Sequence, residues 1–173
     1  WALKLDIKKF FESVDHKILM NLVRTKVKDK DIIWLIQNVI DSFEAKENRG
    51  IPLGNLTSQV FANIYMNELD QYVKHNLKIK CYLRYADDFI ILASNKDSLY
   101  QCISTLTQFL LDRLSLELHP DKVTIRKLSW GIDFLGYIVL PYYVLPRTKT
   151  KRRLLSKIEE KRNDLNFSQT LAS

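Results

Sequence analysis

The sequence is poor in the residues that interrupt or crosslink a chain. Its 173 residues include only four glycines, four prolines and two cysteines, with 46% hydrophobic and 27% charged residues. This composition argues against disorder and predicts a globular α/β chain with one core. Cys81 and Cys102 lie in apolar runs, so both are expected to be buried free thiols in a reducing compartment.

Long apolar runs, a targeting leader and zinc-like spacings are missing as well. No stretch of about 18 uncharged apolar residues occurs, which argues against a membrane span. No basic-then-apolar leader is found, and Trp1 is not an initiator residue, so we expect an internal piece of a longer cytoplasmic protein. His16, His75 and His119 lack zinc-like spacing to the cysteines, so core or surface roles are expected for them.

Positive charge is concentrated near the end of the chain. Residues 147–162 include eight basic and two acidic groups, whereas the first 146 residues have 19 basic and 17 acidic groups. The basic stretch is therefore expected to be a separate surface element that follows a phosphate backbone. An ordinary solvated helix is the alternative for this stretch taken alone.

Apolar periodicity predicts strands that alternate with helices. Strands are expected at residues 2–7, 79–85, 89–93, 123–125 and 133–139, and helices at 16–27, 31–42, 57–75, 97–116 and 150–165. Asp15 has the chemistry of a helix cap, and residues 44–55 read as a loop. The expected core faces include Ile32, Leu35, Ile36 and Val39 in the second helix, and Val60, Phe61, Ile64, Tyr65, Leu69, Tyr72 and Val73 in the third, which leaves Ala62 on a small, polar side. The predicted fold class is α+β, an antiparallel sheet with helices on one face.

Three carboxylates form the candidate site. Asp87 and Asp88 lie at a hairpin turn between strand-like runs that are too apolar for a solvated loop tip. Asp6 lies on a strand that could pair beside this hairpin. Adjacent carboxylates repel unless a cation compensates them, and hard cations such as Mg²⁺ prefer oxygen ligands. Two such ions can activate an attacking hydroxyl and stabilise a departing pyrophosphate.

Five segments resemble the ordered motifs of reverse transcriptases. Tyr-Ala-Asp-Asp at 85–88 resembles the family signature, and residues 5–11 resemble the first aspartate motif. Residues 50–59 resemble the loop and helix start that hold the incoming nucleotide and template. Residues 119–122 and 134–137 resemble two later palm motifs. The resemblance covers roughly residues 1–140 and implies a palm at 1–146, the start of a basic helical thumb at 147–173, and absent fingers.

The resemblance also implies roles for individual residues. Asp6 and Asp87 would hold two Mg²⁺ ions, which Mn²⁺ could replace, with Asp88 in support and Ile7 supplying a backbone carbonyl. Phe11 would exclude a ribose 2′-hydroxyl, although a core role for Phe11, or Phe10 as the gate, is an alternative. Lys122 would lie near the leaving pyrophosphate, or be a surface lysine. The remaining implied residues are Ile7, Leu53, Gly54 and Gln59 for substrate, Phe134, Leu135, Gly136 and Tyr137 for gripping the primer, and Arg147, Lys149, Lys151, Arg152 and Arg153 for nucleic acid.

Two positions depart from the pattern of most bacterial relatives. Those enzymes have glutamine before the loop glycine and proline after the serine, where this chain has Leu53 and Gln59. This pattern resembles the reverse transcriptases of diversity-generating retroelements, which copy a template RNA with frequent errors at adenine. Leucine cannot make the hydrogen bond that glutamine offers, so polar positioning of the nucleotide should weaken. Retron-like or group II intron-like enzymes are the alternatives.

The expected partners follow from the same resemblance. They are template RNA, a primer, the RNA–DNA duplex and deoxynucleotides, with a small basic accessory protein as a further candidate, in a bacterial or phage-encoded system. A non-catalytic RNA-binding palm is a competing interpretation, which the three aspartates disfavour. An RNA-dependent RNA polymerase is another, which Phe11 disfavours.

Overall fold

The chain folds into two compact units, residues 1–125 and the segment from Arg126 onward. The computed structural model describes residues 1–163, so the last part of the predicted thumb lies outside the described residues. The predicted boundary at 146/147 falls inside the second unit and stays a prediction. The described residues contain no helix that is both long and apolar enough to cross a membrane.

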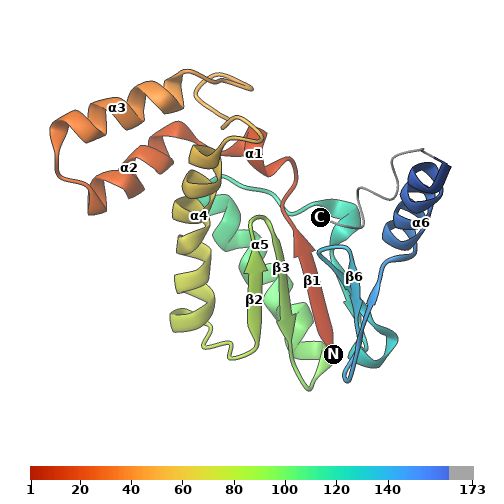
Figure 1. The fold of residues 1–173 in the computed structure, drawn as a ribbon. Helices are drawn as coiled ribbons and strands as arrows, with labels where there is room; N and C mark the ends of the chain where they lie inside the picture. Colours follow the sequence, from red (N-terminus) through yellow and green to blue (C-terminus); the bar gives the residue numbers. More distant parts are fainter. Residues whose placement is uncertain (164–173) are drawn as a thin grey trace. The chain divides into compact units, whose positions relative to one another are not determined.

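The first unit is built around an antiparallel sheet. Its strands are β1 (Ala2–Asp6), β2 (Tyr82–Tyr85), β3 (Asp88–Leu92) and β4 (Thr124–Arg126), in the order β2-β3-β1-β4. In the β1–β3 register, Leu3 is opposite Ile91 and Leu5 is opposite Phe89. All four side chains are fully buried, because alternate strand residues point to the same face. The predicted α+β class with an antiparallel sheet is confirmed (Figure 1).

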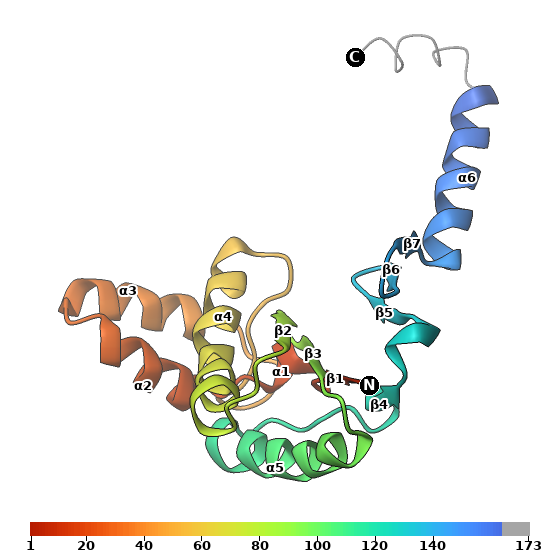
Figure 2. The same ribbon diagram turned by 90° about the horizontal axis from the view of Figure 1, so that it is seen from below.

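Helices form the other layer of this unit. They are α1 (Phe10–Ser13), α2 (His16–Lys26), α3 (Lys30–Asp41), α4 (Leu56–Gln71), which continues as the π-helical turn η1 (Tyr72–Asn76), and α5 (Lys96–Leu114); the 3₁₀ turn η2 (Pro120–Lys122) follows. Helix α5 runs along one face of the sheet (Figures 1 and 2). Leu99, Leu106 and Leu110 of α5 belong to the same buried cluster as the β1 and β3 leucine, isoleucine and phenylalanine side chains. Burial of this face is the main stabilising contribution to the fold.

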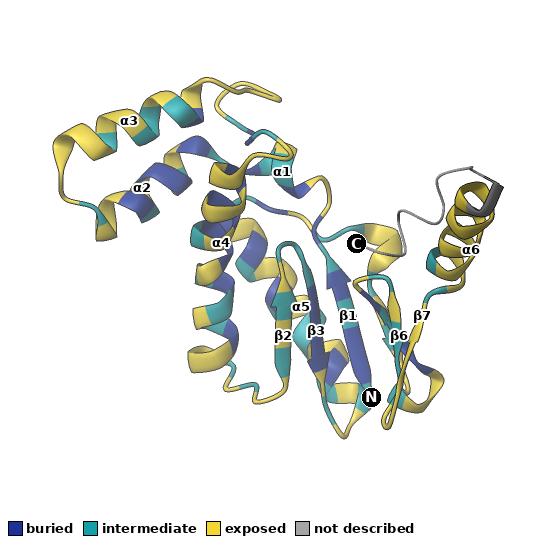
Figure 3. Cartoon of the chain, in the orientation of Figure 1, coloured by how far each residue is buried: buried dark blue, intermediate teal, exposed yellow. Residues whose placement is uncertain are grey.

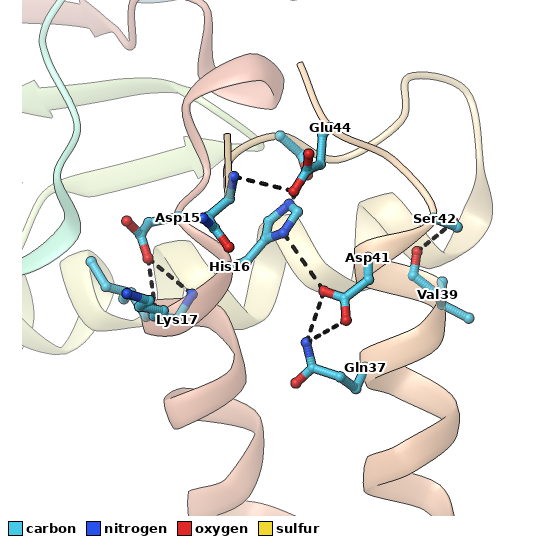
Figure 4. Close-up of polar contacts among 11 residues, drawn as sticks. Asp15, His16, Lys17, Gln37, Val39, Asp41, Ser42 and Glu44 are labelled. Atoms are coloured by element: carbon cyan, nitrogen blue, oxygen red, sulfur yellow. Dashed lines mark hydrogen bonds and ion pairs between the residues drawn. The ribbon is translucent and has the colours of Figure 1, made fainter. Parts of the chain in front are cut away.

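Aspartate side chains cap the N-termini of two helices. The Asp15 carboxylate accepts hydrogen bonds from the amides of Lys17 and Ile18, so the predicted cap of α2 is confirmed. Asp29 caps α3 in the same way. Figure 4 shows buried His16 beside Asp41 of α3, with 3.9 Å between Nδ1 and the carboxylate. A core role for His16 is therefore confirmed.

The predicted core face of α3 is partly wrong. Ile32 and Leu35 are 49% and 56% exposed, whereas Ile40 is buried. Apolar residues cover a wide arc of this helix, which packs against α2. One neighbouring helix covers only part of such an arc. The helical spacing of the apolar residues was therefore predicted correctly, but the side of the helix that is buried was not (Figure 3).

Helix α4 shows a similar error at two positions. Val60, predicted inside, is 50% exposed, and Ala62, predicted outside, is 2% exposed. The buried stripe instead includes Phe61, Ala62 and Tyr65, because a small side chain allows close helix packing. The buried Tyr65 hydroxyl donates to the carbonyl of Leu114 at 2.6 Å and accepts from the amide of Asp15 at 3.3 Å.

Cys81 is exposed, so its predicted burial is wrong, whereas both cysteines are free as predicted. Cys81 immediately precedes β2, which is an edge strand whose residues alternate between exposed and partly buried. Cys102 is partly buried on α5, and this burial raises the pKa of its thiol.

The second unit contains a small antiparallel sheet and a helix. Strands β5 (Ile132–Phe134), β6 (Tyr137–Val139) and β7 (Val144–Pro146) form the sheet, with the turn η3 (Leu128–Trp130) before it and α6 (Thr148–Asn163) after it. Strand β7 was not predicted, because it has only three residues, ends in proline and has little pattern of its own.

Candidate active site

Two strands bring the three predicted carboxylates to one edge of the first sheet. Asp6 ends β1 and lies directly opposite Asp88, which begins β3. Residues opposite each other in an antiparallel pair share a face, so Asp6 and Asp88 point to the same side. Asp87 lies in the two-residue turn between β2 and β3, after Ala86 with φ +51°. This left-handed backbone is unusual for alanine and marks a turn that its surroundings must hold in place.

Backbone hydrogen bonds then bring Lys122 to the same edge. The Lys8 amide donates to the Glu117 carbonyl at 2.8 Å, and the His119 amide donates to the Asp6 carbonyl at 2.8 Å. Ile7 bridges Leu118 between them. The segment after α5 therefore runs along the end of β1. The Lys122 ammonium reaches the Asp6 carboxylate at 3.0 Å, across 116 residues of sequence.

A second lysine, which the sequence analysis missed, neutralises Asp88. The Lys4 ammonium lies 3.3 Å from the Asp88 carboxylate, and both side chains are about a fifth exposed (21% and 22%). Lys4 lies two residues before Asp6 on the same strand, so the strand alternation could have identified it. The other Asp88 oxygen, Oδ1, is buried and has no hydrogen-bond partner among the described residues. A buried carboxylate oxygen without a donor is costly.

The electrostatics of the edge are those of crowded carboxylates. Burial raises the pKa of Asp87, and the nearby negative charges of Asp6 and Asp88 raise it further. Burial also raises the pKa of Asp88, although the Lys4 charge opposes the change. The hydrogen bond to Asp6 raises the pKa of Lys122. The edge therefore resists holding three negative charges without further cations.

A divalent cation fits the chemistry of this donor set. Within residues 1–163, no three His, Cys, Asp or Glu side chains converge as a metal-binding group, and ammonium groups face two of the three aspartates. The backbone nevertheless aligns the carboxylates on one edge, and the unpartnered Asp88 oxygen has no donor. Oxygen-only ligands suit a hard cation such as Mg²⁺. Asp6, Asp87 and Asp88 are thus the residues that would hold it.

The predicted nucleotide loop lies beside the predicted gate. The Ile51 amide donates to the Phe11 carbonyl at 2.7 Å, which ties residues 50–54 to α1. Leu53 is 73% exposed, and Gly54, with φ +87°, faces open space. Phe11 packs edge-on against Phe10, which is buried in the core. The buried ring of Phe10 is unavailable to a substrate, whereas Phe11 is partly exposed and its role as a gate stays a prediction.

The first turn of α4 has one exposed and one buried polar side chain. Gln59 is exposed there. Ser58, one residue earlier, is 1% exposed, and its hydroxyl has no hydrogen-bond partner among the described residues. The contact of Gln59 with substrate stays a prediction.

The predicted primer grip is the β5–β6 hairpin of the second unit. Its two-residue turn has positive φ at both positions, +52° at Leu135 and +86° at Gly136, as a type I′ turn requires. Phe134 is buried, whereas Tyr137 is 51% exposed. The Gly136 carbonyl accepts from the Arg147 amide at 2.9 Å and from the Thr150 hydroxyl at 3.3 Å. The start of α6 therefore supports the hairpin.

The basic helix carries exposed cations. Arg147 pairs with Asp133, so its charge is compensated. Arg147 also lines an open pocket of about 580 Å³. The other residues that line this pocket are Lys149, Thr150, Arg152, Arg153 and Ser156. Lys151 is exposed on the same helix. These predicted phosphate contacts all belong to the second unit.

Comparisons with known proteins identify the family of this chain. Residues 1–139 match the family model described as reverse transcriptase (RNA-dependent DNA polymerase), so the chain belongs to that family. The chain is 26% identical, over 79% of its length, to the group II intron-encoded protein LtrA of Lactococcus lactis. It is 27% identical to the protein YkfC of Escherichia coli over 79% of its length. It is 24% identical to a putative COX1/OXI3 intron 2 protein of Saccharomyces cerevisiae over 91% of its length.

These relatives are longer than the chain, which spans 34%, 46% and 25% of them respectively. Among solved structures, a truncated apo telomerase from Candida tropicalis matches with a TM-score of 0.63 at 19% identity, covering 84% of this chain and 35% of that one. A Candida albicans telomerase matches with a TM-score of 0.61 at 13% identity, covering 84% and 31%. At these identities the match shows the shared fold.

Proposed function

We propose that this chain is the catalytic palm of an RNA-templated DNA polymerase that adds deoxynucleotides to a primer 3′-hydroxyl. The observation that carries the proposal is the register of Asp6 opposite Asp88, with Asp87 in the adjoining turn and Lys122 3.0 Å from Asp6. A protein that only binds RNA has no need for three carboxylates at one sheet edge. Family membership supports the same conclusion.

Each group at the edge has a chemical task in this proposal. Two divalent ions, Mg²⁺ or Mn²⁺, would supply activation of the primer hydroxyl and neutralisation of the pyrophosphate charge. Asp6 and Asp87 would hold them, with Asp88 and the Ile7 carbonyl in support. Lys122 is exposed and carries a firmly held proton, since its pKa is raised, so it can stabilise charge on the leaving pyrophosphate.

The other predicted residues would position substrates. Phe11 would exclude a 2′-hydroxyl, and Leu53, Gly54 and Gln59 would contact the nucleotide and template. The β5–β6 hairpin would grip the primer, and the basic residues at 147–153 would contact the duplex backbone. Template RNA, primer and deoxynucleotides are therefore the proposed partners, in a cytoplasmic, bacterial or phage-encoded system. A small basic accessory protein remains a secondary proposal.

The subfamily proposal rests on the loop. Leu53 is 73% exposed and offers a nucleotide no hydrogen bond, which supports the error-prone enzyme of a diversity-generating retroelement. Similarity to a group II intron-encoded protein favours the intron-like alternative. The spectrum of copying errors separates these two candidates.

The test is primer extension on RNA by the longest natural protein that contains this chain, with Mg²⁺. Asp87→Asn should abolish extension, and Asp112→Asn, an exposed aspartate on α5, is the matched control. Errors concentrated at template adenines would favour the diversity-generating enzyme, and accurate copying would favour the intron-like one. No extension with either deoxynucleotides or ribonucleotides, with RNA still bound, would replace the proposal by a binding-only palm.

A further inference from the structure

A buried arginine joins the catalytic hairpin to α4. The Arg84 guanidinium meets the Asp70 carboxylate through two parallel bonds, Nε to Oδ1 at 2.8 Å and Nη2 to Oδ2 at 2.6 Å. The Arg84 side chain is only 9% exposed. The Tyr82 hydroxyl donates to the same Asp70 carboxylate at 2.7 Å. Asp70 is thereby held by two residues of β2.

The same guanidinium also reaches the turn that carries Asp87. Its Nη1 donates to the Ala86 carbonyl at 2.9 Å, within the same hairpin. Ala86 is the residue with φ +51°, and its carbonyl belongs to the peptide group that continues into Asp87. A left-handed alanine persists only where surrounding contacts hold it. The bond from Arg84 is such a contact.

From these contacts we infer that Arg84 is a positioning residue, which fixes the Ala86–Asp87 turn by holding the Ala86 carbonyl while Asp70 and Tyr82 fix the guanidinium. Only a planar fork of donors can bond a carboxylate twice and keep a third nitrogen for the carbonyl. A lysine at this position would keep the charge but lose the geometry. This inference rests on the proposed function and deepens it.

Electrostatics support the same arrangement. Burial alone would lower the pKa of Arg84, but the hydrogen bonds and charge of Asp70 outweigh it, so the pKa is raised. Burial, followed by the bond to Asp70, raises the pKa of Tyr82. Both groups therefore keep the protons that they donate to Asp70 and Ala86.

The experiment uses the longest natural protein that contains the chain and compares Arg84→Lys, Asp70→Asn and Tyr82→Phe with Arg113→Lys. Arg113 is an exposed arginine on α5 and provides the matched control. Rapid-quench single-turnover extension gives both the rate constant per active molecule and the active fraction. Hydrogen–deuterium exchange of the peptide covering 82–92 reports the turn directly, without any need for activity.

We expect Arg84→Lys to lower the single-turnover rate constant about 100-fold, because a displacement of about 1 Å at reacting groups has that effect. The Kd for primer–template should stay within about twofold, since Arg84 is buried away from solvent. Exchange at the turn should accelerate about tenfold, while α3 is unchanged. Asp70→Asn should behave similarly, Tyr82→Phe should show a smaller change, and Arg113→Lys none.

Two results would overturn the inference. In the first, Arg84→Lys lowers the active fraction or the melting temperature but leaves the rate constant per active molecule unchanged, as a purely structural ion pair would. In the second, exchange at the turn does not change. If the unmodified protein extends no primer, the proposed function fails, and the exchange measurement alone then supports or refutes the positioning role.

Discussion

Removing one negative charge from the carboxylate edge should stabilise the metal-free protein while abolishing its activity. The pKa of Asp87 is raised by burial and by its neighbours Asp6 and Asp88, so the folded protein holds that proton more tightly than the unfolded chain does. The stability that this group contributes is fully present at pH values below the ordinary pKa of an aspartate in the unfolded chain. It is lost as the pH rises through the raised pKa, so at pH 7 the ionised Asp87 opposes folding.

The magnitude of the effect is limited by solvent. Asp87 is partly exposed, and charge interactions at such positions are worth about 0.5–1 kcal/mol. Asp87→Asn should therefore raise the free energy of unfolding by about that amount at pH 7. For a chain of this size, the melting temperature should rise by about 1–4 °C. The gain should vanish at acidic pH, where the wild-type carboxyl is protonated.

Divalent metal should reverse the order of stability. Mg²⁺ at ten times its Kd adds about 1.4 kcal/mol to a protein that binds it at one site. The wild type should gain this, and Asp87→Asn should gain less, so the variant melts lower with Mg²⁺ and higher without it. Melting curves from pH 4 to 8, with EDTA or Mg²⁺, make the comparison, and Asp112→Asn is the control. A variant that melts lower than wild type at pH 7 in EDTA would refute the reasoning.

Three further predictions test other parts of the structure. Tyr65→Phe should lower the free energy of unfolding by about 1–3 kcal/mol, since it leaves buried backbone groups without their hydroxyl partner, as urea unfolding would show. Gly50→Ala should lower the free energy of unfolding by about 2–3 kcal/mol, because the φ of Gly50 is +112° and an added Cβ would lie 2.9 Å from the backbone and side chain of Ala45. Gly54 has open space around it, so Gly54→Ala should lower the free energy of unfolding by only about 1 kcal/mol, through backbone strain. Leu53→Gln should lower the error rate at template adenines, because glutamine restores a hydrogen-bonding group at the nucleotide loop; sequencing of extension products measures it.

Each of these predictions has a result that contradicts it. A loss below about 0.5 kcal/mol in Tyr65→Phe would mean that water replaces the hydroxyl. Equal costs in Gly50→Ala and Gly54→Ala would mean that the clash near Gly50 relaxes freely. An unchanged error spectrum in Leu53→Gln would remove the leucine as the cause of infidelity.

Local sequence rules predicted most elements of the first unit. The α2 helix was predicted to within a residue, because Asp15 caps it and leucine and valine recur at helical spacing. The Asp87–Asp88 hairpin was predicted because two apolar strand-like runs leave no other place for two adjacent carboxylates. The phase of α3 could not be predicted, since it depends on which side α2 covers, and the sequence of α3 does not contain that information.

The candidate site was likewise predictable from the sequence only in part. The sequence by itself singled out the candidate residues, because two adjacent carboxylates stand between apolar strand-like runs and the ordered motifs resemble those of reverse transcriptases; the roles of these residues stay predictions. The tertiary structure alone decided that Asp6 lies opposite Asp88, that Lys122 reaches Asp6 across 116 residues, and that Arg84 bonds the Ala86 carbonyl while Asp70 holds its guanidinium. Strand register and the path of the chain after α5 fix these contacts. Both depend on how the whole core packs, so no local pattern encodes them.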